Sequence, residues 1–442
     1  MRASFSRLNF PLGRWVFLCF AGAAVWYVCL TLLLGFRPMQ PFDFGLAFNS
    51  MAEHLLVGRF DVDPDAIGAE GFDSRGRTVA YFGIFCALLR VPLVLVPSLA
   101  PTDLTFWSCL IAITGAAWFQ TRAVLLIWTP GSILPAALLL SLLLAGPNIQ
   151  FLRPSIYQEP INWAFLQSMA FVYLAARGSL APDGFNRRIL SWMALCAGLA
   201  LITRVSFGVS LYAAIGLLMV THISRSIIVP AIILAAFAGA ACVVNAGRWG
   251  NPFVFADFTQ FYLSQDAEPA RLGHLAAYGA FHPARIWLGL SYYFLPIWIW
   301  IRADGHVLFT ETQAAMMDAV ELPAGSFLLT DPLLLGLAIS GVWNIRDRTR
   351  AVLLLGLAAG PVLMLCAISM AHRYRMEFYP FFLMAALFGK PRLSKGFIIG
   401  ALIIGIAASH AMAIVYARSP WGPGEFYLER HGLMETYTRA PR

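Results

Sequence analysis

Carboxylates are concentrated in one polar stretch of this chain, residues 37–103. Side chains of this kind can take a proton from a reacting group or supply oxygen ligands to a divalent cation. The acidic residues of the stretch up to position 73 are Asp43, Glu53, Asp61, Asp63, Asp65, Glu70 and Asp73. A divalent cation near Asp61, Asp63 and Asp65 is one interpretation of this pattern. A solvated acidic loop is the simpler one, and we predict no cofactor and no obligatory metal.

The cysteines give no further indication of a metal site. All seven lie in apolar segments, and no Cys-x-x-Cys or Cys/His ligand spacing occurs in the sequence. We therefore interpret them as small apolar side chains and expect neither a zinc site nor disulfides.

An amphipathic helix is predicted over residues 44–58, where apolar side chains recur three and four positions apart. Such a helix would lie on a membrane surface and end at Gly58. Asp43 would then be its N-cap, a role that stabilises a helix by ~1 kcal/mol. Capping alone could account for this aspartate, so its position does not by itself indicate catalysis.

The composition of the chain is that of a membrane protein. Of its 442 residues, 59% are hydrophobic and 12% charged, whereas soluble proteins have about 25% charged residues. A soluble enzyme, a disordered scaffold and a nucleic-acid-binding domain are therefore excluded. A bilayer-spanning helix needs about 20 apolar residues. The candidate spans are residues 15–36, 104–121, 131–147, 160–176, 189–203, 205–221, 226–247, 327–343, 351–371, 378–389 and 396–417.

Two apolar segments that contain prolines, 78–99 and 285–301, are predicted to be interfacial or re-entrant instead of spanning. This choice places the clusters Arg177/Arg187/Arg188, Arg346/Arg348/Arg350 and Lys390/Arg392/Lys395 in the cytoplasm, as the positive-inside rule requires. The prediction is an all-α protein with about eleven transmembrane helices, a cytoplasmic N-terminus and an outer C-terminus.

This topology divides the chain into four segments. They are a membrane module of residues 1–260 that includes the first outer loop 37–103, a second outer loop 261–326, further membrane helices 327–417 and a tail 418–442. No internal repeat is evident, which argues mildly against a secondary transporter.

Six short motifs together resemble those of the GT-C superfamily of integral-membrane glycosyltransferases, such as lipid A aminoarabinose transferases and protein mannosyltransferases. The run PFDFGLAFNSMAEHLLVGRFDVDP (41–64) is similar to the first periplasmic loop of the family, with Asp43 in the leading acidic position. The other motifs are GRTVAYFGIFCALLRVP (76–92), SIYQEPINWAF (155–165), GLALITRVSFG (198–208), NAGRWGNPF (245–253) and HRYRMEFYPFF (372–382). The leading position has Phe-Asp-Phe where the family often has Asp-Glu, which leaves the acceptor open.

The resemblance implies a GT-C-like bundle that moves a sugar from a polyprenyl-phosphate carrier to a glycan, lipid or protein acceptor. The reaction would take place with inversion at the periplasmic face of a bacterial inner membrane. It implies Asp43 as general base. It implies donor phosphate or sugar contacts for Arg77, Tyr81, Glu159, Arg204, Arg248, Arg373, Tyr374, Arg375 and Glu377. Glu159 is expected to face the same cavity and to pair with one of these arginines.

Each of these residues also has a simpler interpretation, as a headgroup contact or an interfacial anchor. Two other functions compete with this one. One is a transporter or flippase for lipid-linked saccharides, and the other is a polymerase or ligase of another membrane fold. The ionisable residues cluster at predicted helix ends, whereas transport would need several of them deep within the spans. This distribution favours chemistry at the membrane surface.

Overall fold

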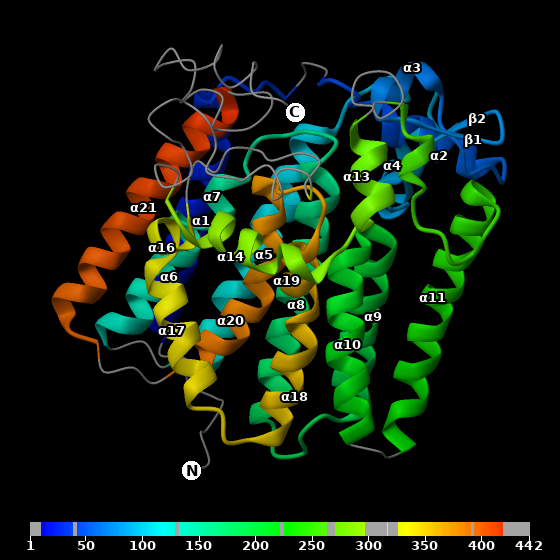
Figure 1. Ribbon diagram of the computed structural model, residues 1–442. Helices are drawn as coiled ribbons and strands as arrows, with labels where there is room; N and C mark the ends of the chain where they lie inside the picture. Colours follow the sequence, from blue (N-terminus) through cyan, green and yellow to red (C-terminus); the bar gives the residue numbers. More distant parts are fainter. Residues whose placement is uncertain are drawn as a thin grey trace.

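The computed structural model describes residues 10–38, 42–128, 132–221, 225–262, 270–296, 316, 326–389 and 393–418. These residues form a bundle of long helices, with shorter elements gathered at one end (Figure 1). The strands among them make one short antiparallel hairpin. The fold is thus all-α, as the sequence predicted.

The bundle is built from helices of very different lengths. In chain order they are α1 (Phe10–Leu33), α5 (Thr105–Ile127), α6 (Ile133–Leu144), α7 (Pro147–Gln150), α8 (Gln158–Leu180), α9 (Arg187–Thr203), α10 (Val205–Thr221), η2 (Arg225–Ile227), α11 (Ile228–Trp249), α16 (Phe327–Thr330), α17 (Pro332–Trp343), α18 (Arg348–Leu357), α19 (Ala359–Cys366), η6 (His372–Phe378), α20 (Tyr379–Leu387) and α21 (Lys395–Arg418). Side chains from these helices, from α1 at one end of the chain to α21 at the other, form one hydrophobic core.

Six helical stretches in the described part of the chain are long and apolar enough to cross a membrane. They are Arg14–Leu33, Thr105–Ile127, Ile133–Gln150, Ile228–Trp249, Arg348–Cys366 and Lys395–Ala417. All eleven segments predicted as spans coincide with a helix or a pair of helices. Several of these helices are short, such as α17 with 12 residues and α20 with 9. The chain is therefore a multi-pass membrane protein, and the count of eleven spans stays a prediction.

Glycines allow two pairs of bundle helices to touch through their backbones. A Cβ at Gly341 of α17 would lie 1.9 Å from the backbone oxygen of Ala385 in α20. A Cβ at Gly356 of α18 would lie 2.2 Å from the Cα of Ala214 in α10. Small residues at such contacts are typical of membrane bundles, because packing and not the hydrophobic effect drives helix association there.

The described part of residues 37–103, called loop 1 below, folds over a small apolar core that also includes Ile156 near the start of α8. The elements of loop 1 are α2 (Ala47–Leu56), α3 (Pro64–Ile67), η1 (Gly68–Glu70), β1 (Phe72–Ser74), β2 (Arg77–Val79) and α4 (Phe85–Val94). The hairpin turns at Arg75 and Gly76, which have φ of 57° and 72°, as a two-residue turn that matches strand twist requires. Figure 1 shows these elements at one end of the bundle.

The predicted helix over residues 44–58 is confirmed with a correction. α2 begins at Ala47, because Phe44 adopts a left-handed φ of 59°, and its N-cap is Leu46. Asp43 therefore does not cap this helix, and the capping interpretation was wrong. The predicted stop is correct, since α2 ends at Leu56 and Gly58 has a φ of 74°.

Neither proline-containing segment forms a long helix in the residues described. Segment 78–99 contains α4, and segment 285–301 contains α14 (Ile286–Phe294), which follows η3 (Phe258–Gln260), α13 (Ala270–Tyr278) and η4 (Pro283–Arg285). At 1.5 Å per residue these helices of about ten residues reach roughly 15 Å, half the thickness of a bilayer core. Most of the predicted loop 261–326 and the tail after residue 418 lie outside the described residues.

Candidate functional site

An ion pair joins the end of α9 to η6. Arg204, directly after α9, donates from Nε to Oε1 of Glu377 at 2.8 Å. Ser206 donates its hydroxyl to the same oxygen at 2.5 Å. Burial raises the pKa of the Glu377 carboxyl, against the opposing effects of Arg204 and Ser206. The side chain of Arg204 keeps 18% exposure while that of Glu377 is buried, so the pair holds a guanidinium at the border of the core.

Tyrosines surround two arginines, Arg204 after α9 and Arg373 on η6. The guanidinium carbon of Arg204 lies 5.1 Å from the centre of the Tyr374 ring, and that of Arg373 lies 5.4 Å from it. Arg373 also lies 4.6 Å from the centre of the Tyr157 ring. The phenol of Tyr81 is close enough to both arginines and to Tyr374 to interact with them electrostatically. Tyr81, Tyr157, Arg204, Arg373 and Tyr374 are called the tyrosine–arginine cluster below.

Loop 1 contributes a carboxylate to this cluster. Glu70 in η1 lies close enough to Tyr157 and Tyr81 for its negative charge to act on both phenols. Burial raises the pKa of both phenols, and the negative charge of Glu70 raises it further. Both phenols therefore stay protonated at neutral pH. Neither Glu70 nor Tyr157 was among the predicted site residues, although Tyr157 lies in the motif 155–165 and Glu70 belongs to the acidic stretch.

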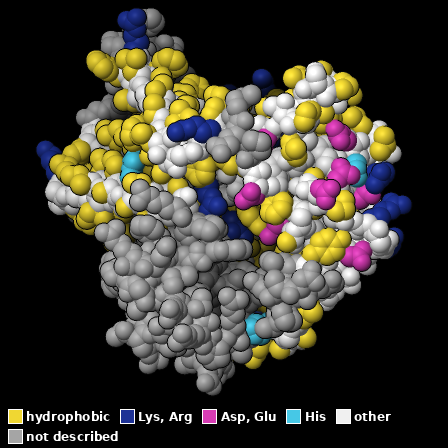
Figure 2. Space-filling model, turned by 90° about the horizontal axis from the view of Figure 1, so that it is seen from above, with side chains coloured by type: hydrophobic (Ala, Val, Ile, Leu, Met, Phe, Trp, Pro, Cys, Tyr) yellow, Lys and Arg dark blue, Asp and Glu magenta, His cyan; other side chains and the backbone are white. Residues whose placement is uncertain are grey.

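The end of the molecule that bears loop 1 is seen in Figure 2. Lys and Arg side chains lie at a hollow near the middle of this face, and Asp and Glu side chains gather on one side of it. Guanidinium groups form paired hydrogen bonds to phosphate and also stack on aromatic rings. The tyrosine–arginine cluster can therefore bind an anionic group at the surface of the bundle.

Asp43 extends from an anchored segment of loop 1. The backbone N–H of Phe42 donates to Asp103 at 2.9 Å, and the ring of Phe44 lies against Gly68. Phe44 packs on the same small core as Tyr81 and Tyr157. The carboxylate of Asp43 is exposed, and within the described residues it makes neither a hydrogen bond nor an ion pair. An exposed carboxylate thus belongs to the same loop as Tyr81 of the cluster.

Glu159 does not face the cavity that the sequence analysis predicted. It is fully buried, and its Oε1 accepts hydrogen bonds of 2.6 Å from Arg90 and from Ser108. The predicted ion pair exists, but its partner is Arg90 of α4, which was not among the arginines considered. The prediction of a cavity position was wrong because α4 packs against α8 and covers this end of it.

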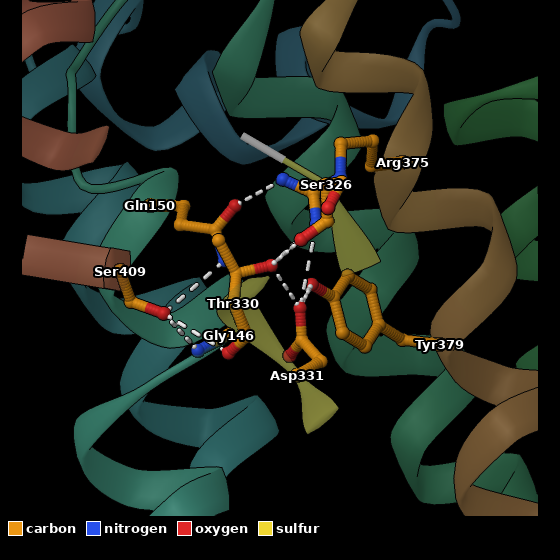
Figure 3. Close-up of polar contacts among 8 residues, drawn as sticks. All are labelled: Gly146, Gln150, Ser326, Thr330, Asp331, Arg375, Tyr379 and Ser409. Carbon is orange, nitrogen blue, oxygen red and sulfur yellow. Dashed lines mark hydrogen bonds and ion pairs between the residues drawn. The ribbon is translucent and has the colours of Figure 1, made fainter. Parts of the chain in front are cut away.

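Arg375 also lies inside the protein, in the polar network drawn in Figure 3. Its Nη1 donates to Gln150 at 2.6 Å, and its Nη2 donates to Thr330 at 2.6 Å and lies 3.4 Å from a carboxylate oxygen of Asp331. The same oxygen accepts a hydrogen bond of 2.8 Å from Tyr379. This network ties η6 to α7 and to the start of α17, so the position of Arg375 gives no support to a donor contact. Asp331 is a lone acidic residue in a predicted span, and such residues usually have a buried basic partner.

The remaining predicted arginines are not part of the cluster. Arg248 is buried at the end of α11 and donates from Nη1 to the backbone oxygen of Phe82 at 2.7 Å, which ties α11 to loop 1. Arg77 is exposed on β2, and in the described part of the chain no hydrogen bond or ion pair joins it to the cluster.

Two of the three aspartates in the acidic turn of loop 1 contact basic side chains. Asp61 pairs with Arg59 at 2.6 Å and with Nδ1 of His54 at 2.7 Å. Asp63 accepts a hydrogen bond from Ser50 and lies 3.3 Å from Nε2 of His54, while Asp65 is exposed. Among the described residues no group of three or more His, Cys, Asp or Glu side chains is arranged to hold a metal ion. The interpretation of this turn as a cation site thus gains no support.

No protein-family model matches the sequence, and no curated protein matches it. Among solved structures, the apo form of an oligosaccharyltransferase from Archaeoglobus fulgidus aligns with 96% of this chain at a TM-score of 0.50 and 13% identity. Two further structures from this organism are similar. They are the oligosaccharyltransferase AglB in complex with an inhibitory peptide and a dolichol-phosphate (98% of this chain, TM-score 0.48, 11% identity) and an oligosaccharyltransferase tethered to an acceptor peptide (96%, 0.46, 12%).

The chain thus has a GT-C-like fold, as the motifs predicted. At 13% identity this likeness concerns the fold and not the activity. The chain spans 57–59% of the length of the three proteins.

Proposed function

We propose that the protein is a membrane glycosyltransferase that moves a sugar from a polyprenyl-phosphate carrier to an acceptor at the periplasmic face of a bacterial inner membrane. The observation that carries the proposal is the tyrosine–arginine cluster at one end of a GT-C-like bundle. Loop 1, which contributes Tyr81 to this cluster, also carries the exposed carboxylate of Asp43. In this proposal the phosphate and sugar of the donor would meet the guanidinium groups of Arg204 and Arg373 at this end of the bundle.

Arg204 is the residue best placed to stabilise a departing phosphate. Its Nε is held by Glu377, and within the described residues its two terminal nitrogens make no hydrogen bond. Those nitrogens form the planar fork that pairs with two phosphate oxygens. A fixed cation aimed at developing negative charge lowers the barrier of such a transfer without reorganisation. Arg373 would add a second charge, with its guanidinium kept in place by Tyr157 and Tyr374.

Asp43 would act as the general base. An acceptor hydroxyl or amide is a poor nucleophile at neutral pH, so its proton must leave as the sugar carbon is attacked. If acceptor and phosphate occupy opposite faces of the sugar, one base is sufficient and the anomeric configuration inverts. The exposure of Asp43 leaves room for an acceptor, and its anchored neighbours keep the carboxylate in a defined region.

The test is sugar transfer by the purified full-length protein in lipid nanodiscs, with a radiolabelled polyprenyl-phosphate sugar and a membrane extract as the source of acceptor. Asp43→Asn should lower the rate by about 10² to 10⁴, the usual contribution of a general base. Binding of the donor and the melting temperature should stay close to those of the parent. Asp65→Asn is the matched control, because it removes an exposed carboxylate of the same loop.

Transfer retained in the Asp43→Asn protein would remove this residue from the base role. Arg204→Gln should instead weaken binding of the donor about tenfold or more, as expected for a lost charged hydrogen bond. Movement of the intact donor across the membrane of vesicles, without cleavage of the sugar–phosphate bond, would favour a flippase over a transferase.

A further inference from the structure

A groove lies between α5, α8 and α9, with a volume of about 540 Å³. Its wall consists almost entirely of apolar and aromatic side chains, among them Leu166 and Tyr173 of α8 and Trp192 and Leu195 of α9. On α8 the lining residues extend from Leu166 to Arg177, which is about 16 Å along a helix axis. This length is close to the ~15 Å thickness of one leaflet of the bilayer core.

Arginines surround one end of this groove. Arg177 near the end of α8 and Arg188 at the start of α9 both line it, and both are exposed. Neither side chain makes a hydrogen bond or an ion pair with another described residue. Arg122 of α5 contacts the groove residue Tyr173, with its Nη2 3.5 Å from the tyrosine hydroxyl.

The charged end of the groove is remote from the tyrosine–arginine cluster. Arg188 begins α9 and Arg204 directly follows it, so the two lie at opposite ends of a helix of 17 residues. No Asp or Glu is among the residues that line the groove. The groove is thus an apolar channel of one-leaflet length with unpaired positive charge at the membrane surface.

We propose that this groove binds one anionic phospholipid from the leaflet opposite the candidate site. An acyl chain would lie against Leu166, Tyr173 and Leu195, and the phosphate would accept hydrogen bonds from Arg177 and Arg188. The pairing is favourable because two guanidinium groups exposed at the membrane surface gain an anionic partner that accepts charged hydrogen bonds. Basic pockets between transmembrane helices bind anionic lipids by the same principle. The proposal does not depend on the glycosyltransferase function.

The test measures lipid retained by the purified full-length protein with native mass spectrometry after detergent exchange. The probes are phosphatidylglycerol and phosphatidylcholine with identical acyl chains, and inorganic phosphate as competitor. We expect phosphatidylglycerol to bind at least tenfold more tightly than phosphatidylcholine. Arg177→Gln/Arg188→Gln should reduce its affinity about tenfold or more, the effect of losing charged hydrogen bonds.

Two further variants separate this groove from general surface charge. Arg346→Gln/Arg348→Gln removes the same charge from exposed positions near the start of α18 and should leave binding unchanged. Leu195→Trp fills the groove without changing charge and should lower the affinity for phosphatidylglycerol, which also tests the proposal if the double arginine variant does not fold. Equal binding of the two lipids would overturn the proposal. An equal loss of affinity for phosphatidylglycerol in the Arg346/Arg348 control would also overturn it. Complete displacement of the lipid by inorganic phosphate would overturn it as well.

Discussion

Arg204 and Glu377 are 173 positions apart in the sequence, yet Nε of the arginine lies 2.8 Å from Oε1 of the glutamate. The contact links the loop between α9 and α10 to η6, which also carries Arg373 and Tyr374. Because the glutamate is buried and the arginine is partly exposed, the carboxylate positions the guanidinium. A residue that was predicted to contact the sugar donor is thus better described as a positioning residue for Arg204.

The Arg204–Glu377 pair predicts a specific pattern of stabilities. Arg204→Met leaves a buried carboxylate without its cation and should cost about 3–5 kcal/mol of unfolding free energy. The double variant Arg204→Met/Glu377→Leu removes both charges and should be more stable than the single variant, since apolar replacement of a buried ion pair is often neutral. Denaturation in mixed detergent micelles measures both. A double variant no more stable than Arg204→Met would contradict the buried pair.

The Arg375 network should matter for folding more than for binding of the donor. Asp331→Ala leaves the buried guanidinium of Arg375 without its carboxylate, so we expect a loss of about 3–5 kcal/mol. Tyr379→Phe removes a single hydrogen bond of the same network and should cost about 0.5–1.5 kcal/mol. The free energies of unfolding of the two variants measure this difference. Equal effects would mean that the charge of Arg375 is satisfied elsewhere.

Loop 1 should lose stability in acid through Asp61. Burial alone would raise the pKa of Asp61, but hydrogen bonds from Arg59 and His54 hold it below its usual value of 3.8. A carboxyl group whose pKa is lower in the folded than in the unfolded state stabilises the fold at pH values above its unfolded pKa. This stabilisation is lost as the pH falls through the folded pKa. The protection of amides in α2 and α3 against hydrogen exchange, measured relative to unstructured peptide at the same pH, should therefore fall below pH 3.8. Asp61→Asn should show faster exchange at neutral pH and a smaller acid effect, whereas Asp65→Asn should resemble the parent.

The helical segments could be predicted because each depends on a local pattern of apolar residues. All eleven apolar windows and the stop of α2 at Gly58 follow from such patterns. The start of α2 could not be predicted, since it depends on the left-handed conformation of Phe44, whose ring packs on Gly68.

The spatial partners of the charged side chains were harder to predict than the positions of the helices. Arg204 and Glu377 both lie in motifs that were singled out, and the structure brings them together. The partners of Glu159 and Arg375 were missed, because Arg90 and Asp331 lie far from them in the sequence and no local pattern connects them. A rule that each carboxylate in a predicted span or at its end needs a buried cation would have indicated that Glu159 and Asp331 are paired, but not with which arginine.

The membrane orientation can be tested at two exposed positions. Figure 1 shows α3, which contains Asp65, and the start of α18 at Arg348 at opposite ends of the bundle. Basic clusters favour the cytoplasm, so the end with Arg346, Arg348 and Arg350 should be inside and loop 1 should be periplasmic. A membrane-impermeant thiol reagent should therefore label Asp65→Cys in right-side-out vesicles and Arg348→Cys in inverted vesicles only, with the parent protein as the baseline for its seven native cysteines. The reverse pattern would place loop 1 in the cytosol, where the tyrosine–arginine cluster would meet cytosolic acceptors, and the periplasmic reaction proposed above would then be wrong.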